Sequence, residues 1–176
     1  GLDLAYLWLR LTRRAKTMRL ARGYGADPLT GPVAVMIPAF GEAAVIGTTI
    51  GHALTAWPQH ELRLYVGCYR NDPATLAAAM AAAAHDPRVR LVVHGAAGPT
   101  TKADCLNRLY RALCDDERRQ GRRFRAVVLH DAEDMVHPAA LQAIDAALGA
   151  VDFVQLPVRP GLLPQSRWIA GHYADE

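Results

Sequence analysis

Three acidic residues gather behind a short apolar run in the second half of the chain. Asp131, Glu133 and Asp134 follow residues 127–129 within a few positions, and that run fits a buried strand. Ligands of open α/β sheets bind just outside the carboxyl ends of the strands. Carboxylates this close repel one another, and a hard cation such as Mg²⁺ or Mn²⁺ removes that repulsion and can also hold a diphosphate. The cluster therefore predicts a metal–phosphate site with these three acids as candidate metal ligands.

Strands and helices must hold this cluster in place, and the rest of the sequence predicts both. Apolar runs typical of strands alternate with helical stretches and short loops. The expected strands span residues 33–38, 62–67, 89–93, 124–130 and 153–156. The expected helices span residues 42–57, 73–85, 101–114 and 138–148. This alternation predicts an α/β fold in which helices cover both faces of a mainly parallel sheet.

Further polar residues follow the other expected strands, so the same edge of the sheet should collect them. Each also has a purely structural interpretation. Glu42 favours the start of its own helix, Asp72 is suited to cap the helix that Pro73 opens, and Lys102 can be a surface residue of a first helical turn. Thr100 or Thr101 is the expected cap of that last helix. A cation is slightly unfavourable at a helix start, which mildly supports an anion-binding role for Lys102.

The composition is that of an ordinary globular domain. Hydrophobic residues make up 51% of the 176 positions and charged residues 21%, enough for one domain with its own core. The net charge of +3 is unevenly spread, with basic clusters over residues 10–22 and 118–125. Phe124 is the one aromatic residue in the second cluster, which is a poor match to a nucleic-acid groove. We interpret that cluster as a solvated helix end and expect no nucleic-acid partner.

Residues 1–27 form a separate basic segment and linker. Apolar and basic residues alternate there at helical spacing, with Tyr6 and Trp8 among them, a pattern suited to an anionic membrane surface. A helix packed on its own domain is the alternative. No apolar run is long enough to cross a bilayer. Because Gly1 is not an initiator methionine, we expect a segment cut from a longer protein.

The cysteines and the missing motifs exclude several classes of protein. Cys68, Cys105 and Cys114 form no C-x-x-C pair, so we expect reduced, mostly buried thiols, a cytosolic compartment and no zinc site. The sequence lacks the P-loop, the G-x-G-x-x-G dinucleotide fingerprint and the G-x-S-x-G elbow. P-loop nucleotidases, Rossmann dehydrogenases and the common serine hydrolases are therefore not expected.

Four segments in order resemble the motifs of family 2 glycosyltransferases, which have the GT-A fold. They are residues 35–42, the Lys-Ala-x-x-Leu-Asn start at 102–107, the acids at 131–134 and the Gln-x-Pro at 155–157. The match covers roughly residues 33–158. Residues 69–73, 98–107 and 130–134 are similar to a narrower group of inner-membrane proteins that carry a family 2 domain between transmembrane segments.

The resemblance implies a role for each candidate residue. The backbone of Pro38 and Ala39, together with Glu42, would border the ribose and base of a nucleotide. Asp72 would face the uracil edge and Lys102 would lie near the diphosphate. Asp131 and Glu133 would be the catalytic Asp-x-Asp pair that contacts the nucleotide sugar and its Mg²⁺ or Mn²⁺.

The implied activity is transfer of a sugar, from a donor such as a UDP-sugar, to an acceptor at the cytoplasmic side of the bacterial inner membrane. Residues 28–176 would be the N-terminal, nucleotide-binding part of such a domain, incomplete at its C-terminal side. Gly41 replaces the family's usual Asn, and Glu133 its second Asp. No Thr-Glu-Asp loop for a catalytic base and no Gln-x-x-Arg-Trp motif occurs before Glu176, so the base is expected further along.

Two other functions remain open at this point. A nucleotide-binding regulatory or receptor-assembly module of a membrane protein would need the same donor site but no base. A nucleotidyltransferase shares acids at strand ends, although residues 38–41 make a poor glycine-rich phosphate loop.

Overall fold

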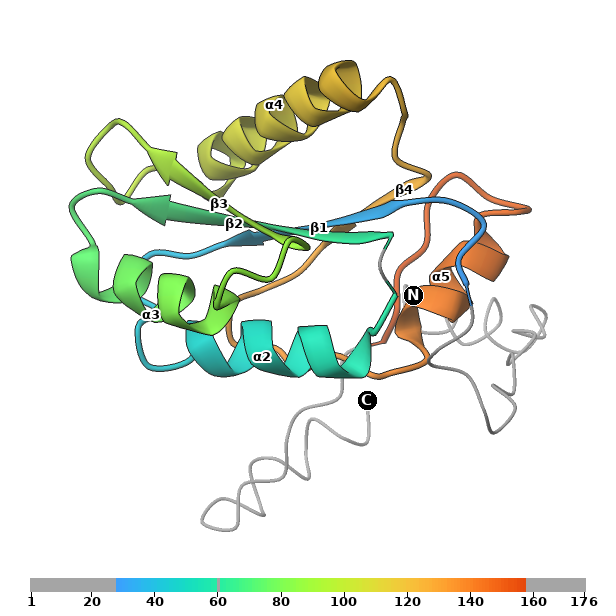
Figure 1. The fold of residues 1–176 in the computed structure, drawn as a ribbon, viewed down its shortest axis with the longest axis horizontal. Coiled ribbons are helices and arrows are strands. Elements are labelled where there is room, and N and C mark those ends of the chain that lie inside the picture. The colour runs from blue at the N-terminus through green and yellow to red at the C-terminus, as the bar shows by residue number, and fades with distance from the viewer. Residues whose placement is uncertain (1–27, 60, 158–176) are drawn as a thin grey trace, which may run out of the picture.

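The computed structural model describes residues 28–59 and 61–157, in which strands and helices alternate (Figure 1). The elements are β1 (Val33–Pro38), α2 (Ile46–Ala56), β2 (Leu62–Tyr69), α3 (Pro73–Ala83), β3 (Val89–His94), α4 (Lys102–Gln120), β4 (Ala126–Leu129) and α5 (Ala140–Ala147). The predicted N-terminal basic segment, residues 1–27, lies outside the described residues.

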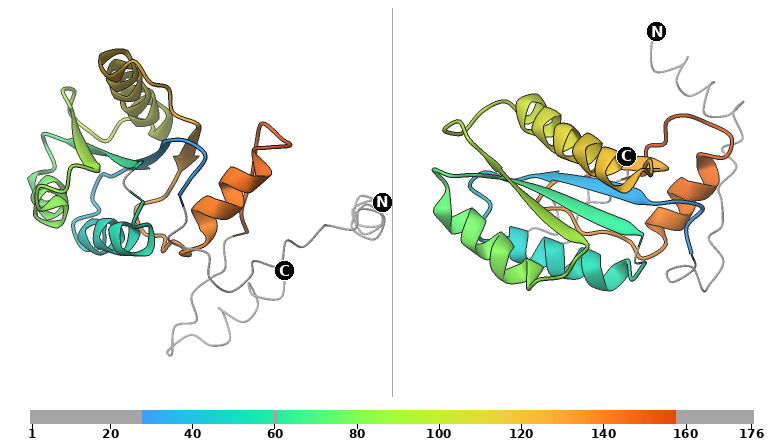
Figure 2. Two further views of the ribbon diagram at one scale, coloured as in Figure 1. Left: turned by 45° about the vertical axis from the view of Figure 1, so that its right-hand side comes forward. Right: turned by 45° about the horizontal axis from the view of Figure 1, so that its top comes forward.

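The four strands form one parallel sheet in the order β3-β2-β1-β4. Helices α2 and α3 lie on one face, α4 crosses the other, and α5 lies beyond β4 (Figures 1 and 2). The predicted α/β fold, with a parallel sheet and helices on both faces, is therefore confirmed. Among the described residues, no helix is long and apolar enough to cross a membrane.

The core lies on both faces of β1. Val33, Val35 and Ile37 pack toward α2, and Ala34 and Met36 pack toward α4, each at most 2% exposed. A continuous apolar run is what a central parallel strand needs, because helices cover both of its sides. Because β1 is a central strand, its carboxyl end lies between the carboxyl ends of β2 and β4.

Helix α4 packs unusually closely on β2 at Gly67. A Cβ atom at that position would lie 2.5 Å from the Cys105 sulfur and 3.3 Å from a Leu109 methyl carbon. Both partner side chains are buried. The absence of a side chain at Gly67 therefore fixes how near the first half of α4 comes to the sheet.

Two helix boundaries differ from the prediction by four residues or more, and the others by two at most. Glu42 begins a turn rather than a helix, and its carbonyl accepts hydrogen bonds from Val45 at 3.0 Å and Ile46 at 2.9 Å. Helix α4 continues to Gln120, beyond the expected end near residue 114, and stops where Gly121 takes a left-handed conformation with φ of 62°. The last turns of this helix consist mainly of charged residues, which form helices well but carry no apolar pattern. A prediction based on apolar spacing therefore ended the helix too early.

Both predicted helix caps are confirmed. The Asp72 carboxylate accepts a hydrogen bond from the Thr75 amide at 3.2 Å, and Pro73 occupies the first turn of α3. The Thr101 hydroxyl accepts from the Asp104 amide at 3.1 Å at the start of α4. These side chains satisfy amide groups that have no partner within the helix.

The predicted strand at 153–156 is wrong. Residues 151–157 form no strand, and Phe153 is 80% exposed. Apolar and β-branched residues favour a strand only where a neighbouring strand supplies hydrogen bonds and packing. In the described part of the chain, β4 pairs with β1 alone, and this segment does not add to its other edge. The predicted strand 124–130 does form, but only over Ala126–Leu129.

Candidate functional site

The strand order β3-β2-β1-β4 places a point of reversal at the carboxyl ends of β1 and β4, and we call the region outside these two strand ends the crevice. From β1 the chain winds away through β2 and β3, and α4 then carries it back to β4 on the other side of β1. In open α/β sheets, ligands bind at this point of reversal, outside the strand ends. The loop beginning at Ala39 and the loop beginning at His130 border the crevice, as the sequence predicts for the candidate residues.

The acids after β4 occupy a tight turn. The Asp134 amide donates to the Asp131 carbonyl at 3.3 Å. Glu133 is exposed, Asp134 is half-buried, and the Asp131 side chain is 46% exposed. The ammonium of Lys102, at the start of α4, forms an ion pair with the Asp131 carboxylate. The structure thus joins two predicted site residues that lie 29 positions apart.

The acids do not converge on a common point: no group of three or more His, Cys, Asp or Glu residues in the described chain is arranged to enclose a metal ion. Mg²⁺ is commonly held by one or two carboxylates together with substrate phosphates and water. The accessible oxygens of Asp131 and Glu133, in a crevice that Lys102 also borders, are a donor set of that kind. They fit a cation bound together with a diphosphate better than one held by protein alone.

The acid turn is held from behind by three side chains of the α2 region. Thr49 donates to the Ala132 carbonyl at 2.5 Å, His52 Nε2 lies 2.9 Å from the Val136 carbonyl, and Trp57 donates to the His137 carbonyl at 3.1 Å. Sequence reasoning missed these residues. Their one signal is a buried Thr and a partly buried His in a helix whose other buried residues are apolar.

The loop after β1 is fastened by Asp72. Its carboxylate accepts from the Gly41 amide at 2.6 Å as well as capping α3, and the Thr75 hydroxyl accepts from the Glu42 amide at 3.0 Å. Partial burial raises the pKa of Asp72, but hydrogen bonds from Thr75 and Gly41 outweigh it and leave the pKa below its usual value. Asp72 is therefore ionised at neutral pH and shapes the backbone of this loop.

The remaining predicted residues of this loop differ in accessibility. Ala39 is buried, and its amide donates to the Gly67 carbonyl at 2.8 Å, so its backbone is fixed to β2. Pro38 and Glu42 are partly exposed. Phe40, which was not among the predicted site residues, is 37% exposed at the same edge. An accessible ring beside a fixed backbone is a surface on which a flat ligand can stack.

The loop between β3 and α4 rests on aromatic side chains of the neighbouring strands. Tyr69 packs edge-on against Phe40 at 5.2 Å, and its hydroxyl lies 2.6 Å from the Thr100 hydroxyl. Asn71 exchanges two hydrogen bonds with the Gly98 backbone, at 2.8 and 2.7 Å. A Cβ at Gly98 would lie within 2.8 Å of both rings. The sequence indicated a glycine-containing loop here but not the side chains that hold it.

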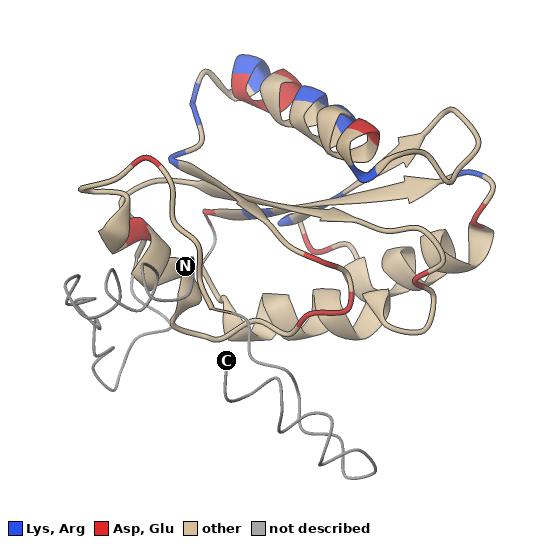
Figure 3. Cartoon of the chain, turned by 180° about the vertical axis from the view of Figure 1, so that it is seen from behind, with Lys and Arg blue, Asp and Glu red and all other residues tan. Residues whose placement is uncertain are grey.

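The two arginines in the last turn of α4 have structural partners. Arg118 and Arg119, in the last turn of α4, pair with Asp115 and Asp116 at 2.6 Å, and blue segments mark this end of the helix and the loop beyond it in Figure 3. Asp116 is also the acceptor for the buried Tyr65 hydroxyl at 2.8 Å. This arrangement agrees with the predicted solvated helix end.

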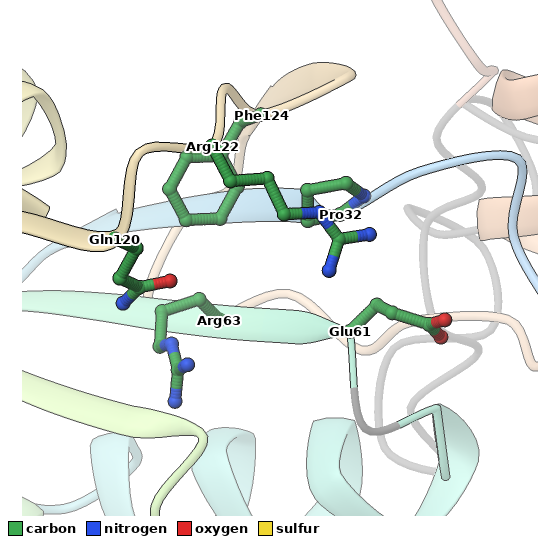
Figure 4. A pocket seen from close by; sticks show the side chains of 6 residues that line it. All are labelled: Pro32, Glu61, Arg63, Gln120, Arg122 and Phe124. Atoms are coloured by element: carbon green, nitrogen blue, oxygen red, sulfur yellow. The ribbon is translucent and has the colours of Figure 1, made fainter. Parts of the chain in front are cut away.

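A small pocket of about 90 Å³ lies at the opposite, amino-terminal edge of the sheet (Figure 4). Its lining residues are Pro32, Glu61, Arg63, Gln120, Arg122 and Phe124. In Figure 4 the Arg122 side chain extends beside Phe124 and Pro32, whereas the Arg63 guanidinium points the other way. Arg63 donates to the Pro87 carbonyl. The pocket therefore combines acidic and basic side chains and is separate from the crevice.

The thiols are free, as predicted: Cys68 and Cys105 are buried and Cys114 is partly exposed. Burial raises the pKa of Cys68 to about 11, with smaller contributions from Cys105 and Asp72. A thiol with such a pKa stays protonated at neutral pH and is a poor nucleophile. Cys68 and Cys105 are therefore core residues and not candidates for the chemistry.

Comparison with known proteins agrees with the geometry of this site. Residues 30–175 match the model of the family described as glycosyltransferase like family 2. Bacteriophage adsorption protein B of Escherichia coli (strain K12) is 33% identical over 180 residues, which cover 99% of this chain. Bacteriophage N4 adsorption protein B of Escherichia coli O157:H7 is similar to the same extent.

The narrower resemblance predicted from the motifs at residues 69–73, 98–107 and 130–134 is therefore confirmed. The matched region is 24% of each relative, so the chain spans about a quarter of the length of the curated relatives it matches. The family model, in contrast, covers nearly the whole chain, including every predicted site residue. On this match, and with the parallel α/β fold that carries the site, the chain belongs to glycosyltransferase family 2.

Proposed function

We propose that the crevice between β1 and β4 is the donor half of a glycosyltransferase site. It would bind a nucleotide sugar, a UDP-sugar in our proposal, together with Mg²⁺ or Mn²⁺, for transfer of the sugar to an acceptor. The observation that carries the proposal is the pairing of Lys102 with Asp131 across the crevice. A cation and an anion held this close, both accessible, are suited to exchange partners with a metal diphosphate, which carries the same two charges.

The acids have distinct roles in this proposal. Asp131 and Glu133 would hold the cation and act as the catalytic pair, with Asp134 as a third candidate ligand. When bound, the cation would neutralise the diphosphate that leaves as the bond to the sugar breaks. Lys102, released from Asp131, would place its ammonium against the same diphosphate.

The nucleoside would lie along the loop after β1. The backbone of Pro38 and Ala39 is fixed by β2, and Glu42 and Asp72 border the same loop. The accessible ring of Phe40 offers a stacking surface for the base. Asp72 would act mainly through the backbone it holds, because both of its carboxylate oxygens accept hydrogen bonds within the protein.

We further propose that the domain works at the cytoplasmic face of a bacterial inner membrane. The support is the basic and aromatic composition of residues 1–27, together with the similarity to adsorption protein B. The proposal assigns no acceptor-activating base to the residues that the structure describes.

Calorimetric titration of UDP in the presence of Mn²⁺, and then of EDTA, tests the donor site. We expect metal-dependent binding that Asp131→Asn and Glu133→Gln each weaken at least about tenfold, which corresponds to about 1.4 kcal/mol. Asp115→Asn, which removes an equivalent carboxylate from the far end of α4, is the matched control and should bind normally.

Two outcomes would contradict the proposal. Absence of UDP binding by a folded wild-type chain would exclude a competent donor site in this segment. Binding that is indifferent to EDTA and to both acid substitutions would instead favour a nucleotide-binding module without metal-assisted transfer.

A further inference from the structure

We propose that His94 is a positioning residue that aims Lys102 at the crevice, and through it at the diphosphate of the donor. The inference rests on the proposed function. His94 is the last residue of β3 and is 2% exposed, whereas the apolar residues of that strand are partly exposed. A polar ring thus occupies the most buried position of this strand.

Both nitrogens of the imidazole are engaged. Nδ1 accepts from the Ala96 amide at 3.2 Å, and Nε2 lies 3.0 Å from the Asp104 carboxylate. The Arg108 Nε–H points to the same nitrogen, 2.8 Å away, and places the guanidinium charge beside that carboxylate. The ring therefore connects the loop after β3 to the first turn of α4.

Lys102 lies in the chain between Thr100 and Asp104, and both of these residues are linked to the His94 ring, directly or through Tyr69. Asp104 is two residues further along the same helical turn, and its amide is capped by the Thr101 hydroxyl. On the other side, the imidazole stacks on Tyr69 with ring centres 4.8 Å apart and planes 16° from parallel. The Tyr69 hydroxyl meets Thr100. The backbone before and after Lys102 is thus tied to His94 or to its stacking partner.

This arrangement differs from simple core filling. An apolar side chain at position 94 could pack against Tyr69 without any polar partner, and burying a polar group is favourable only where its hydrogen bonds are made. The polar contacts of His94 reach the 95–101 loop and α4, and not the sheet. Their loss should therefore displace the Lys102 turn more than it disturbs the strands.

The test compares His94→Phe with His94→Gln. Phenylalanine keeps a ring to stack on Tyr69 but loses the polar contacts to Ala96, Asp104 and Arg108, whereas glutamine keeps an N–H that can reach Asp104. Tyr65→Phe is the matched control, because it removes another buried hydrogen bond of α4, at the end distant from the crevice. Affinities for UDP and for uridine, which lacks the diphosphate, are measured with Mn²⁺.

We expect His94→Phe to weaken UDP binding about tenfold, the loss of one hydrogen bond to a charged group, and to leave uridine binding unchanged. His94→Gln should recover most of the loss, and Tyr65→Phe should alter neither ligand. In a Lys102→Met background, His94→Phe should not weaken UDP binding further, since no ammonium remains to be positioned. Equal losses for UDP and uridine, or a full loss in that background, would overturn the proposal.

Amide hydrogen exchange without ligand separates this inference from the donor-site proposal. His94→Phe should speed exchange at Ala96 and Asp104 and leave β1 unchanged. Unchanged exchange at both amides would refute the positioning role whatever the nucleotide result. If the wild-type chain binds no UDP but His94→Phe still speeds exchange at these two amides, the positioning of the turn is supported and the donor-site proposal fails.

Discussion

The Thr49 hydroxyl of α2 donates a hydrogen bond to the Ala132 carbonyl, 2.5 Å away, although 83 positions separate the two residues. Ala132 lies between Asp131 and Glu133, and both partners of the bond are buried. The bond therefore fixes the short stretch of backbone from which the two proposed catalytic carboxylates project. It links the packing of an ordinary core helix to the geometry of the site.

Thr49→Val should destabilise the protein and weaken metal binding. Valine fills nearly the same space but leaves the buried Ala132 carbonyl without its donor, which costs about 1–3 kcal/mol. Urea denaturation measures the first effect, and Mn²⁺ titration with UDP present measures the second. Thr49→Ser keeps the hydroxyl and should retain near-normal metal affinity. A valine variant that binds Mn²⁺ like the wild type would show that the turn holds its shape without this bond.

Lys102→Met should have opposite effects on the two ligands of the proposed site. Removing the ammonium leaves Asp131 free to bind a cation, so Mn²⁺ alone should bind more tightly than to the wild type. UDP with Mn²⁺ should bind more weakly, because the diphosphate loses a cationic partner. Electron paramagnetic resonance of Mn²⁺ and calorimetry check the two halves. Arg111→Met, an exposed change on the same helix, controls for lost charge; weakening of both ligands by Lys102→Met would contradict this account.

Gly67→Ala should destabilise the domain by about 1–3 kcal/mol, the usual cost of overpacking. The new methyl would meet the Cys105 sulfur and a Leu109 methyl, and α4 would have to shift. Adding Cys105→Ala removes the closer of the two contacts, at 2.5 Å, and should recover part of the loss. Chemical denaturation of the four proteins in this double-mutant cycle measures the coupling. Purely additive losses would mean that the helix does not approach β2 so closely.

Stability should fall in acid partly through Asp116. Burial raises its pKa, but hydrogen bonds from Arg90 and Tyr65 outweigh burial, so the folded-state pKa lies below the ordinary 3.8. Protons then bind the unfolded state more readily. The contribution of Asp116 is complete above pH 3.8 and disappears as the pH falls from there through the lower folded value.

Asp116→Asn should therefore lower stability at neutral pH and make its decline below pH 3.8 shallower than in the wild type. Denaturation curves across this range provide the comparison. Asp115→Asn removes a carboxylate from an exposed ion pair of the same helix, which contributes little to stability at neutral pH. An Asp116→Asn curve parallel to that of the wild type would contradict the prediction.

Thiol labelling should distinguish the three cysteines. Cys68, with its pKa raised to about 11 by burial, and the buried Cys105 should react slowly in the native protein. Cys114 is partly exposed and should be labelled first. Mass spectrometry after brief alkylation locates the modified sites, and the same reaction in denaturant should modify all three equally. Rapid native labelling of Cys68 would show that the α2–α3 side of the sheet opens readily.

The fold was predictable because its two central strands, β1 and β2, are buried on both faces. In β1, every residue from Val33 to Ile37 is at most 2% exposed, and such a strand is visible in sequence as an unbroken apolar run. The position of the site followed from the same pattern, since parallel strands bring their carboxyl ends to one edge. The order of the elements also placed Lys102 and Asp131 at that edge, but their ion pair was not predicted.

The supports of the site were not predictable in this way. Thr49 and His94 act through contacts that depend on how α2 and α4 pack, and no periodicity identifies the distant carbonyl or carboxylate that each will meet. The segment at 153–156 failed for a related reason. Its residues favour a strand, but a strand also needs hydrogen bonds and packing from a neighbouring strand, and among the described residues this segment pairs with none.

Among the described strands, the acids follow β4, which is four residues long and pairs with β1 alone. Short edge elements open at lower free energy than the centre of a sheet, often without global unfolding. On warming, the acid turn should therefore loosen while β1 and β2 are still intact. The protein would then lose ligand binding at a temperature below its melting temperature. The interval between the two temperatures would measure how strongly the hydrogen bonds from the α2 region hold that turn.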